Sequence, residues 1–148
     1  ASGETDKIIK EKLLLALKNN FNVIFCIGEN KKEKRRKETL KVLKNQISKT
    51  ITNKRVFKNI IIAYEPIWSI GTGIVPSPNE LKTNAIALKK FIKDKFRLTY
   101  NPKLLYGGSV DKKTIHNFQT IKELDGFLIG GASKSAKNFI DIIKNFYK

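Results

Sequence analysis

The sequence has a single cysteine, a single histidine, no methionine and no apolar run long enough to cross a membrane. One cysteine, Cys26, excludes an internal disulfide framework and a cysteine-rich metal site. Because Cys26 lies in the apolar run 23–27, we expect a buried small side chain rather than a reactive thiol. His116 is expected on a helix surface. Residues 1–6 lack the basic and apolar regions of a signal peptide, so we predict a soluble, cytoplasmic chain.

Negative charge is scarce as well. Thirty lysines and arginines stand against 13 acidic residues, which gives a formal net charge of +17. A clustered basic surface would bind nucleic-acid phosphates in a salt-dependent way. The lysines instead recur on the solvent-facing positions of every predicted helix, and only residues 31–37 form a dense cluster. We interpret most of this charge as solvated helix faces, and we expect nonspecific binding to polyanions at low salt.

Apolar runs and helical repeats alternate along the chain. A helix is predicted from Thr5 or Asp6 to about residue 19, and four strand–helix units follow it. The strands are expected at about 22–27, 59–64, 103–106 and 124–129. Such alternation predicts an α/β fold with a parallel sheet, in one domain over residues 1–148. The pattern alone fits either a small doubly wound sheet or part of a barrel.

The helices show sharper local signals. The helix after the first strand is expected to run for about twenty residues, with its start possible near Glu38 because the preceding turn is so basic. The next helix begins where Ser77 can cap it, Pro78 suits its first position and Glu80 can complete a capping box. The last helix is predicted to turn four apolar residues inward: Phe139, Ile142, Ile143 and Phe146.

A carboxylate follows the second predicted strand. Glu65 stands at the strand's end and Pro66 stops the strand. Gly71 and Gly73 allow the loop that begins at Pro66 to move as a lid. Under a closed lid the neighbouring apolar residues would desolvate Glu65, which would raise its pKa and strengthen it as a base. On spacing alone, a glutamate paired with a nearby lysine is an equal alternative. Trp68 is interpreted as a lid anchor, with core packing as the alternative.

Three consecutive strand exits are rich in glycine, at Gly71, at 107–109 and at 130–131. Glycines let backbone N–H groups approach an oxyanion closely, so exits from adjacent strands can converge on one phosphate. Any one glycine pair is weak support, because turns use glycine anyway. Together they predict a phosphate cradle.

Four motifs occur in an order typical of one known family. They are Cys-Ile-Gly-Glu at 26–29, Ala-Tyr-Glu-Pro-Ile-Trp with Ile-Gly-Thr-Gly at 63–73, Tyr-Gly-Gly-Ser-Val at 106–110, and Asp-Gly-Phe-Leu-Ile-Gly-Gly-Ala-Ser at 125–133. The chain resembles the triosephosphate isomerases over almost its whole length, but only the second half of their barrel. The resemblance implies half of a TIM (β/α)8 barrel, with four parallel strand–helix units preceded by one helix.

The resemblance also implies a chemistry. Glu65 would be the catalytic base that interconverts dihydroxyacetone phosphate and glyceraldehyde 3-phosphate through an enediolate, in glycolysis and gluconeogenesis, without cofactor or metal. The phosphate-holding positions would be Gly71, Ser109, Gly130 and Gly131. The lid would consist of Pro66, Ile67, Trp68, Ser69, Ile70, Gly71, Thr72 and Gly73.

Two features depart from the family pattern. In the family the residue matching Tyr106 accepts the backbone N–H at the lid's C-terminal hinge, but an ungapped match puts Pro76 there, which has no N–H to give. The family's catalytic Asn, Lys and His precede the segment that residues 2–5 resemble, so no residue here matches them. The isolated chain is therefore expected to be weakly active or inactive.

Open strand edges predict a partner. Two copies could pair the edges 22–27 and 124–129 and close an eight-stranded barrel, so a homodimer is expected, with an N-terminal half of the barrel as the competing partner. The expected small ligands are triose phosphate and inorganic phosphate or sulfate. Two alternatives stay open, a non-enzymatic phosphate or polyanion binder and a gene fragment without a role of its own.

Overall fold

A parallel sheet forms the centre of the molecule. The computed structural model describes residues 3–147 and contains a four-stranded sheet in the order β1-β2-β3-β4. Its strands are β1 (Val23–Ile27), β2 (Ile60–Tyr64), β3 (Leu104–Tyr106) and β4 (Gly126–Phe127). Strands adjacent in sequence pair in parallel. This is the arrangement of half of a (β/α)8 barrel, and the predicted fold class is confirmed.

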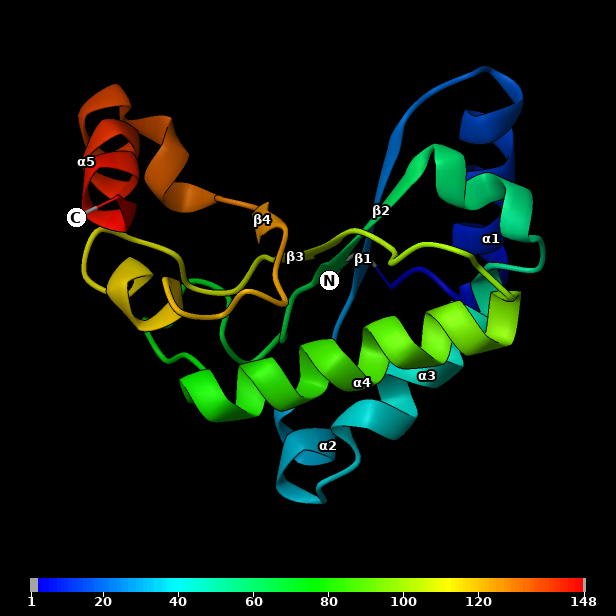
Figure 1. Cartoon of the computed structure of the whole chain (residues 1–148), viewed down its shortest axis with the longest axis horizontal. Coiled ribbons are helices and arrows are strands. Elements are labelled where there is room, and N and C mark those ends of the chain that lie inside the picture. Colours follow the sequence, from blue (N-terminus) through cyan, green and yellow to red (C-terminus); the bar gives the residue numbers. More distant parts are fainter. Residues whose placement is uncertain (1–2, 148) are drawn as a thin grey trace.

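Helices connect the strands and cover one side of the sheet (Figure 1). They are α1 (Asp6–Lys18), α2 (Lys31–Arg35), α3 (Thr39–Thr50), α4 (Pro78–Phe96) and α5 (Ala136–Phe146), with short 3-10 helices η1 (Lys54–Lys58), η2 (Ile115–Phe118) and η3 (Gly131–Lys134). In Figure 1, α4 runs along the lower side of the sheet and α5 stands apart at the C-terminal side. Within residues 3–147, no helix is long and apolar enough to span a membrane.

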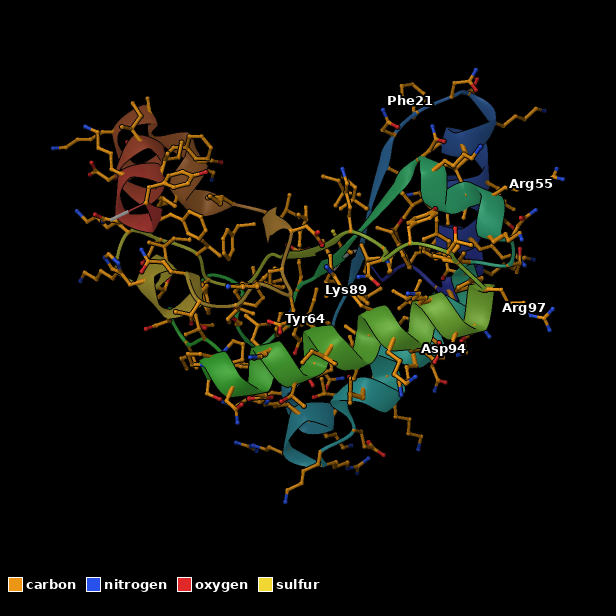
Figure 2. The ribbon with its side chains drawn as sticks, in the orientation of Figure 1. Phe21, Arg55, Tyr64, Lys89, Asp94 and Arg97 are labelled. Carbon is orange, nitrogen blue, oxygen red and sulfur yellow. The ribbon has the colours of Figure 1, made fainter. Side chains whose placement is uncertain are left out.

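The core lies between the sheet and the helices. Along β1 the burial alternates, so Phe25 and Ile27 are buried while Ile24 and Cys26 on the opposite face are exposed. The buried faces of β2, α3 and α4 contribute Ile60, Ile62, Tyr64, Leu43, Ile47, Leu81, Leu88 and Ile92 to one apolar cluster. In Figure 2, the labelled Tyr64 lies between the sheet and α4. The sheet therefore has one covered face and one uncovered face.

The predicted twenty-residue helix after the first strand is wrong, because the chain forms two helices there. Asn30 caps α2 through a capping box with Glu33, and the chain then turns through Lys37, whose φ of 59° is left-handed. The helix α3 begins after Glu38, close to the start inferred from the basic turn. Glu80 does not close a capping box, because its carboxylate pairs with Lys34 instead, although Ser77 does cap α4.

The C-terminal unit is less regular than predicted. The strand expected at 124–129 is confined to two residues, since the Leu124 N–H still bonds to the Ile121 carbonyl in the preceding turn. Asp125 fixes this position, because its carboxylate accepts the Leu104 N–H at 2.8 Å and pairs with Lys89 of α4 at 2.6 Å. In α5 only Ile142 is buried. The inward placement predicted for Phe139 and Ile143 is wrong, because both side chains are exposed on a helix that packs mainly on η2 and η3.

The covered face carries the stability of the fold. Leu43 of α3 is 0% exposed, whereas Ile86 of α4 is 47% exposed. We expect Leu43→Ala to lower the free energy of unfolding by about 2 to 5 kcal/mol, because it leaves a cavity in a packed core. Ile86→Ala is the control and should change it by less than about 0.5 kcal/mol. Urea unfolding followed by circular dichroism measures both, and equal effects would contradict this account of the core.

Candidate functional site

The predicted site residues meet at the C-terminal ends of the strands. A cleft of about 240 Å³ opens there between the lid and the exits of β3 and β4. Its lining includes Glu65, Gly71, Ser109, Gly130 and Gly131. These residues are up to 66 positions apart in the chain, since they run from 65 to 131, yet they border one cleft. His116 lies elsewhere, exposed on η2.

Two glycines hold Glu65 in place. The Glu65 N–H donates to the Ile27 carbonyl at 2.8 Å, and a Cβ on Gly28 would lie 1.9 Å from the Glu65 carbonyl oxygen. A Cβ on Gly107 would lie 2.6 Å from Glu65 Cγ and 2.8 Å from its Oε1. Both positions therefore need glycine, because a larger residue would displace the backbone or the carboxylate.

The half-buried Glu65 carboxylate is available for chemistry. Within residues 3–147, no lysine, arginine or histidine forms an ion pair with it, so the alternative of a structural salt bridge is wrong. Cys26 lies beside it on the uncovered face of β1. The prediction that Cys26 is buried is wrong, because the residue is exposed. Partial burial of the thiol, followed by its hydrogen bond to Glu65 and the charge of that carboxylate, raises the pKa of Cys26 to about 12. The thiol therefore keeps its proton at neutral pH.

A buried carboxylate anchors the N-terminal part of the lid. Glu29 is fully buried, and its Oε1 accepts hydrogen bonds from Trp68 Nε1 at 2.9 Å, Tyr64 Oη at 3.2 Å and Thr39 Oγ1 at 3.3 Å. The Lys34 ammonium lies 5.2 Å from the centre of the Trp68 ring. Trp68 therefore ties the lid to β1 and β2, as the lid-anchor hypothesis requires. Glu29 belongs to the motif at 26–29, but no local pattern in the sequence indicates its role.

Burial and the Glu29 charge also act on the neighbouring ionisable groups. Burial first, and then the negative charge of Glu29, raise the pKa of Tyr64 far above its usual range. Its hydroxyl therefore remains a hydrogen-bond donor to Glu29 at any ordinary pH. Burial lowers the pKa of Lys34, and Glu29 partly opposes that shift.

The C-terminal part of the lid is tied to the exit of β3. The Gly73 N–H donates to Ser109 Oγ at 3.1 Å, and Ser109 Oγ donates to the Ser69 carbonyl. Gly71 and Gly73 have φ values of 69° and 75°, which are left-handed and favour glycine. Tyr106 Oη has a partner although Pro76 offers no N–H, because it bonds to Ser69 Oγ at 3.2 Å.

The glycines predicted to hold phosphate are not required by internal packing. A Cβ added at Gly71, Gly130 or Gly131 would meet no atom within 4 Å. Each of these backbones therefore borders open space, as an anion-binding exit needs. The same cleft contains Asp111. Burial alone would raise the pKa of Asp111, but the N–H groups of Thr114 and Lys113 outweigh it and hold that pKa below its usual range. Its charge is directed to those donors.

Metal chemistry has no donor set in this part of the chain. Among residues 3–147, no group of three or more histidine, cysteine, aspartate or glutamate side chains could hold a metal ion. What the arrangement offers is one carboxylate base next to several backbone N–H groups at strand exits. This combination suits proton transfer on a small anionic molecule.

Comparisons with known proteins agree with this geometry. A family profile described as triosephosphate isomerase matches residues 1–146. The triosephosphate isomerases of Neurospora crassa, Mycoplasma mobile and Saccharomyces cerevisiae are 38%, 41% and 35% identical to the chain over 143, 143 and 144 residues. These alignments cover 95%, 95% and 96% of this chain and 57%, 56% and 58% of the relatives. The chain thus spans somewhat more than half the length of the curated relatives it matches.

The lid anchor can be tested by removing the acceptor. Glu29→Ala leaves the buried Trp68, Tyr64 and Thr39 donors without their shared acceptor, so we expect a loss on the order of 2 kcal/mol in the free energy of unfolding. The emission of Trp68, the only tryptophan, should shift to longer wavelength as the indole becomes solvated. Glu11→Ala, on the exposed side of α1, is the control. An unchanged emission spectrum in Glu29→Ala would refute the anchor.

Proposed function

Because the chain belongs to the triosephosphate isomerase family, we propose that it supplies the base, the lid and the phosphate-binding exits of a site that interconverts dihydroxyacetone phosphate and glyceraldehyde 3-phosphate. One observation carries the proposal. Glu65, with no ion-pair partner in residues 3–147, shares one cleft with Gly71, Ser109, Gly130 and Gly131. A base and a phosphate cradle that line one cleft of about 240 Å³ fit a three-carbon phosphate ester.

In this proposal the chemistry is a proton transfer. The Glu65 carboxylate takes the proton from the carbon next to the substrate carbonyl, which leaves an enediolate. The hydroxyl proton then passes from one enediolate oxygen to the other, and Glu65 returns its proton to the former carbonyl carbon. Atoms and charge balance without an oxidant or a cofactor. The N–H groups at the strand exits would hold the phosphate, and the lid would exclude water from the carboxylate.

The chain alone would lack part of this machinery. The family's Asn, Lys and His have no match among these residues, so nothing here polarises the substrate carbonyl. Loss of one such donor costs about 10² to 10³ in turnover. We therefore propose that the isolated chain binds phosphate and isomerises triose phosphate weakly or not at all.

The uncovered surfaces support a partner that completes a barrel. Large apolar side chains are exposed at the β1 end of the sheet, namely Ile8, Leu14, Leu15, Phe21 and Ile24, and at the β4 end, namely Phe139, Ile140, Ile143 and Tyr147. Phe21 stands at the rim of the molecule in Figure 2. Each end also carries a strand with one unpaired edge. A two-fold axis along the barrel would pair both edges and keep all strands parallel, so we propose a homodimer, with an N-terminal half-barrel as the competing partner.

The charge of +17 favours a second candidate, a non-enzymatic binder of phosphate or other polyanions. Such binding would depend on screened surface charge rather than on the cleft. The two candidates therefore differ in which residues they need.

The first test concerns the cleft. Inorganic phosphate should bind the full chain, and Gly131→Val should weaken binding about tenfold or more, because its side chain would enter the space that the phosphate uses. Glu65→Ala should abolish any triose phosphate turnover that the wild type shows. Ala136→Val, at an exposed position of α5 outside the cleft, is the control.

Two results would count against this function, and a third would count against weak activity of the isolated chain. Phosphate binding that Gly131→Val leaves unchanged would place the anion elsewhere. Salt-sensitive nucleic-acid binding that both variants leave unchanged would favour the polyanion binder. Near-normal turnover that disappears in Glu65→Ala would overturn the statement that the chain alone is weak.

The second test concerns the partner. Sedimentation equilibrium should give a molar mass about twice the 16.9 kDa of one chain. Ile24→Lys should return the mass to that of one chain, because Ile24 is 46% exposed on the uncovered face of β1. Ile86→Lys is the matched control, since Ile86 is 47% exposed on α4, away from both sheet edges. A folded wild-type monomer would sink the homodimer.

A further inference from the structure

Ser69 is a buried polar residue of the lid. Ile67 and Ile70 on either side of it are exposed, but Ser69 is 0% exposed. A small buried polar residue needs partners for its hydroxyl group. Those partners lie in two parts of the chain, at Ile74 just after the lid and at the end of β3 with its exit.

The Ser69 hydroxyl uses its full hydrogen-bonding capacity. Ser69 Oγ donates to the Ile74 carbonyl at 2.6 Å, accepts the Ser109 N–H at 3.2 Å, and lies 3.2 Å from Tyr106 Oη. A hydroxyl has one proton and two lone pairs, and the proton is used at Ile74. Tyr106 must therefore be the donor to Ser69. Burial raises the pKa of Tyr106 to about 12, so the phenol keeps its proton at neutral pH.

The exit of β3 is shaped around this pair. A Cβ on Gly108 would lie 2.2 Å from Tyr106 Oη and 2.6 Å from Ser69 Oγ, so a larger residue would push the two hydroxyls apart. Ser109 adds a second link, because its Oγ donates to the Ser69 carbonyl and accepts the Gly73 N–H. Ser69 thus contacts the exit of β3 through both its side chain and its backbone.

We propose that Ser69 is the positioning residue that locks the lid onto the exit of β3. One hydroxyl joins the lid to the Tyr106 phenol and the Ser109 amide, while its bond to the Ile74 carbonyl stays on the lid side, so the lid cannot lift without breaking two of its hydrogen bonds. Gly71 lies two residues further along, and its position in the cleft depends on that lock. The consequence for phosphate rests on the proposed function, whereas the lock itself does not.

The lock can be measured by amide hydrogen exchange in the full chain, residue by residue, by NMR. Ser69→Ala should speed exchange at Gly73 and Ser109 about tenfold or more, the equivalent of losing one hydrogen bond to a buried group. Exchange at Ile62 in β2 should not change. Thr83→Val is the matched control, because it also removes a hydroxyl-to-carbonyl bond, at 2.8 Å to Asn79, but on α4.

Tyr106→Phe provides a second route should Ser69→Ala fail to fold. Because the phenol acts through Ser69, Tyr106→Phe should accelerate hydrogen exchange at the same two amides. The double variant should accelerate it by less than the two single effects combined. Unchanged exchange at Gly73 and Ser109 in either folded variant would overturn the lock, as would uniform acceleration that includes Ile62.

A phosphate titration followed by Trp68 fluorescence separates the lock from the proposed function. With both correct, inorganic phosphate changes the wild-type emission, and Ser69→Ala needs about tenfold more phosphate for the same change. No response in the wild type, together with faster lid exchange in Ser69→Ala, would leave the lock intact and remove the phosphate site. An equal response in both proteins would overturn the role of the lock in binding.

Discussion

The site depends on one buried negative charge. Removing a carboxylate from water is costly unless hydrogen bonds replace its hydration, and Glu29 at the exit of β1 is fully buried. Its donors are Tyr64 at the end of β2, Trp68 in the lid and Thr39 at the start of α3. All three donors bond to Oε1, and Oε2 has no hydrogen-bond partner within residues 3–147, so none of these segments can move away without a further cost to the buried charge. The carboxylate therefore fixes the frame from which Glu65, one residue after Tyr64, enters the cleft.

The glycines of the site divide into two classes with different physical causes. Gly28, Gly107 and Gly108 are crowded, because a Cβ at each would overlap Glu65 or the Tyr106–Ser69 pair. Gly71, Gly130 and Gly131 face open space, so the protein's own packing does not demand them. The crowded glycines set the positions of the site's side chains, and the open ones border the empty space of the cleft. A substitution in the first class should disturb the protein itself, whereas one at Gly130 or Gly131 should disturb only what binds. Gly71 combines both effects, because its φ of 69° is left-handed and a side chain there would also strain the backbone.

The features that depend on local sequence patterns could be predicted from the sequence. Apolar runs and caps located the strands and most helix starts, and the motifs brought Glu65 and the glycine exits into one predicted site. Contacts that no local pattern encodes were missed, such as Tyr106 with Ser69, 37 positions apart, and Trp68 with Glu29, 39 apart. The errors in α5 have another cause. Its apolar stripe correctly predicts a helix, but an amphipathic pattern does not say whether the partner of that stripe lies within the same 145 described residues, 3 to 147.

The two proposed kinds of association, between copies of the chain and with a polyanion, respond oppositely to salt. Two chains of formal charge +17 repel each other, and that repulsion is screened over about 10 Å at 0.1 M salt. Apolar pairing of sheet edges and of α1 with α5 carries no such penalty, so added salt strengthens association between copies. Binding of a polyanion to the surface lysines that carry this charge weakens with salt, because it depends on counterion release. A surface that associates more as salt rises is acting as the missing side of a barrel, and one that releases its partner is acting through its charge.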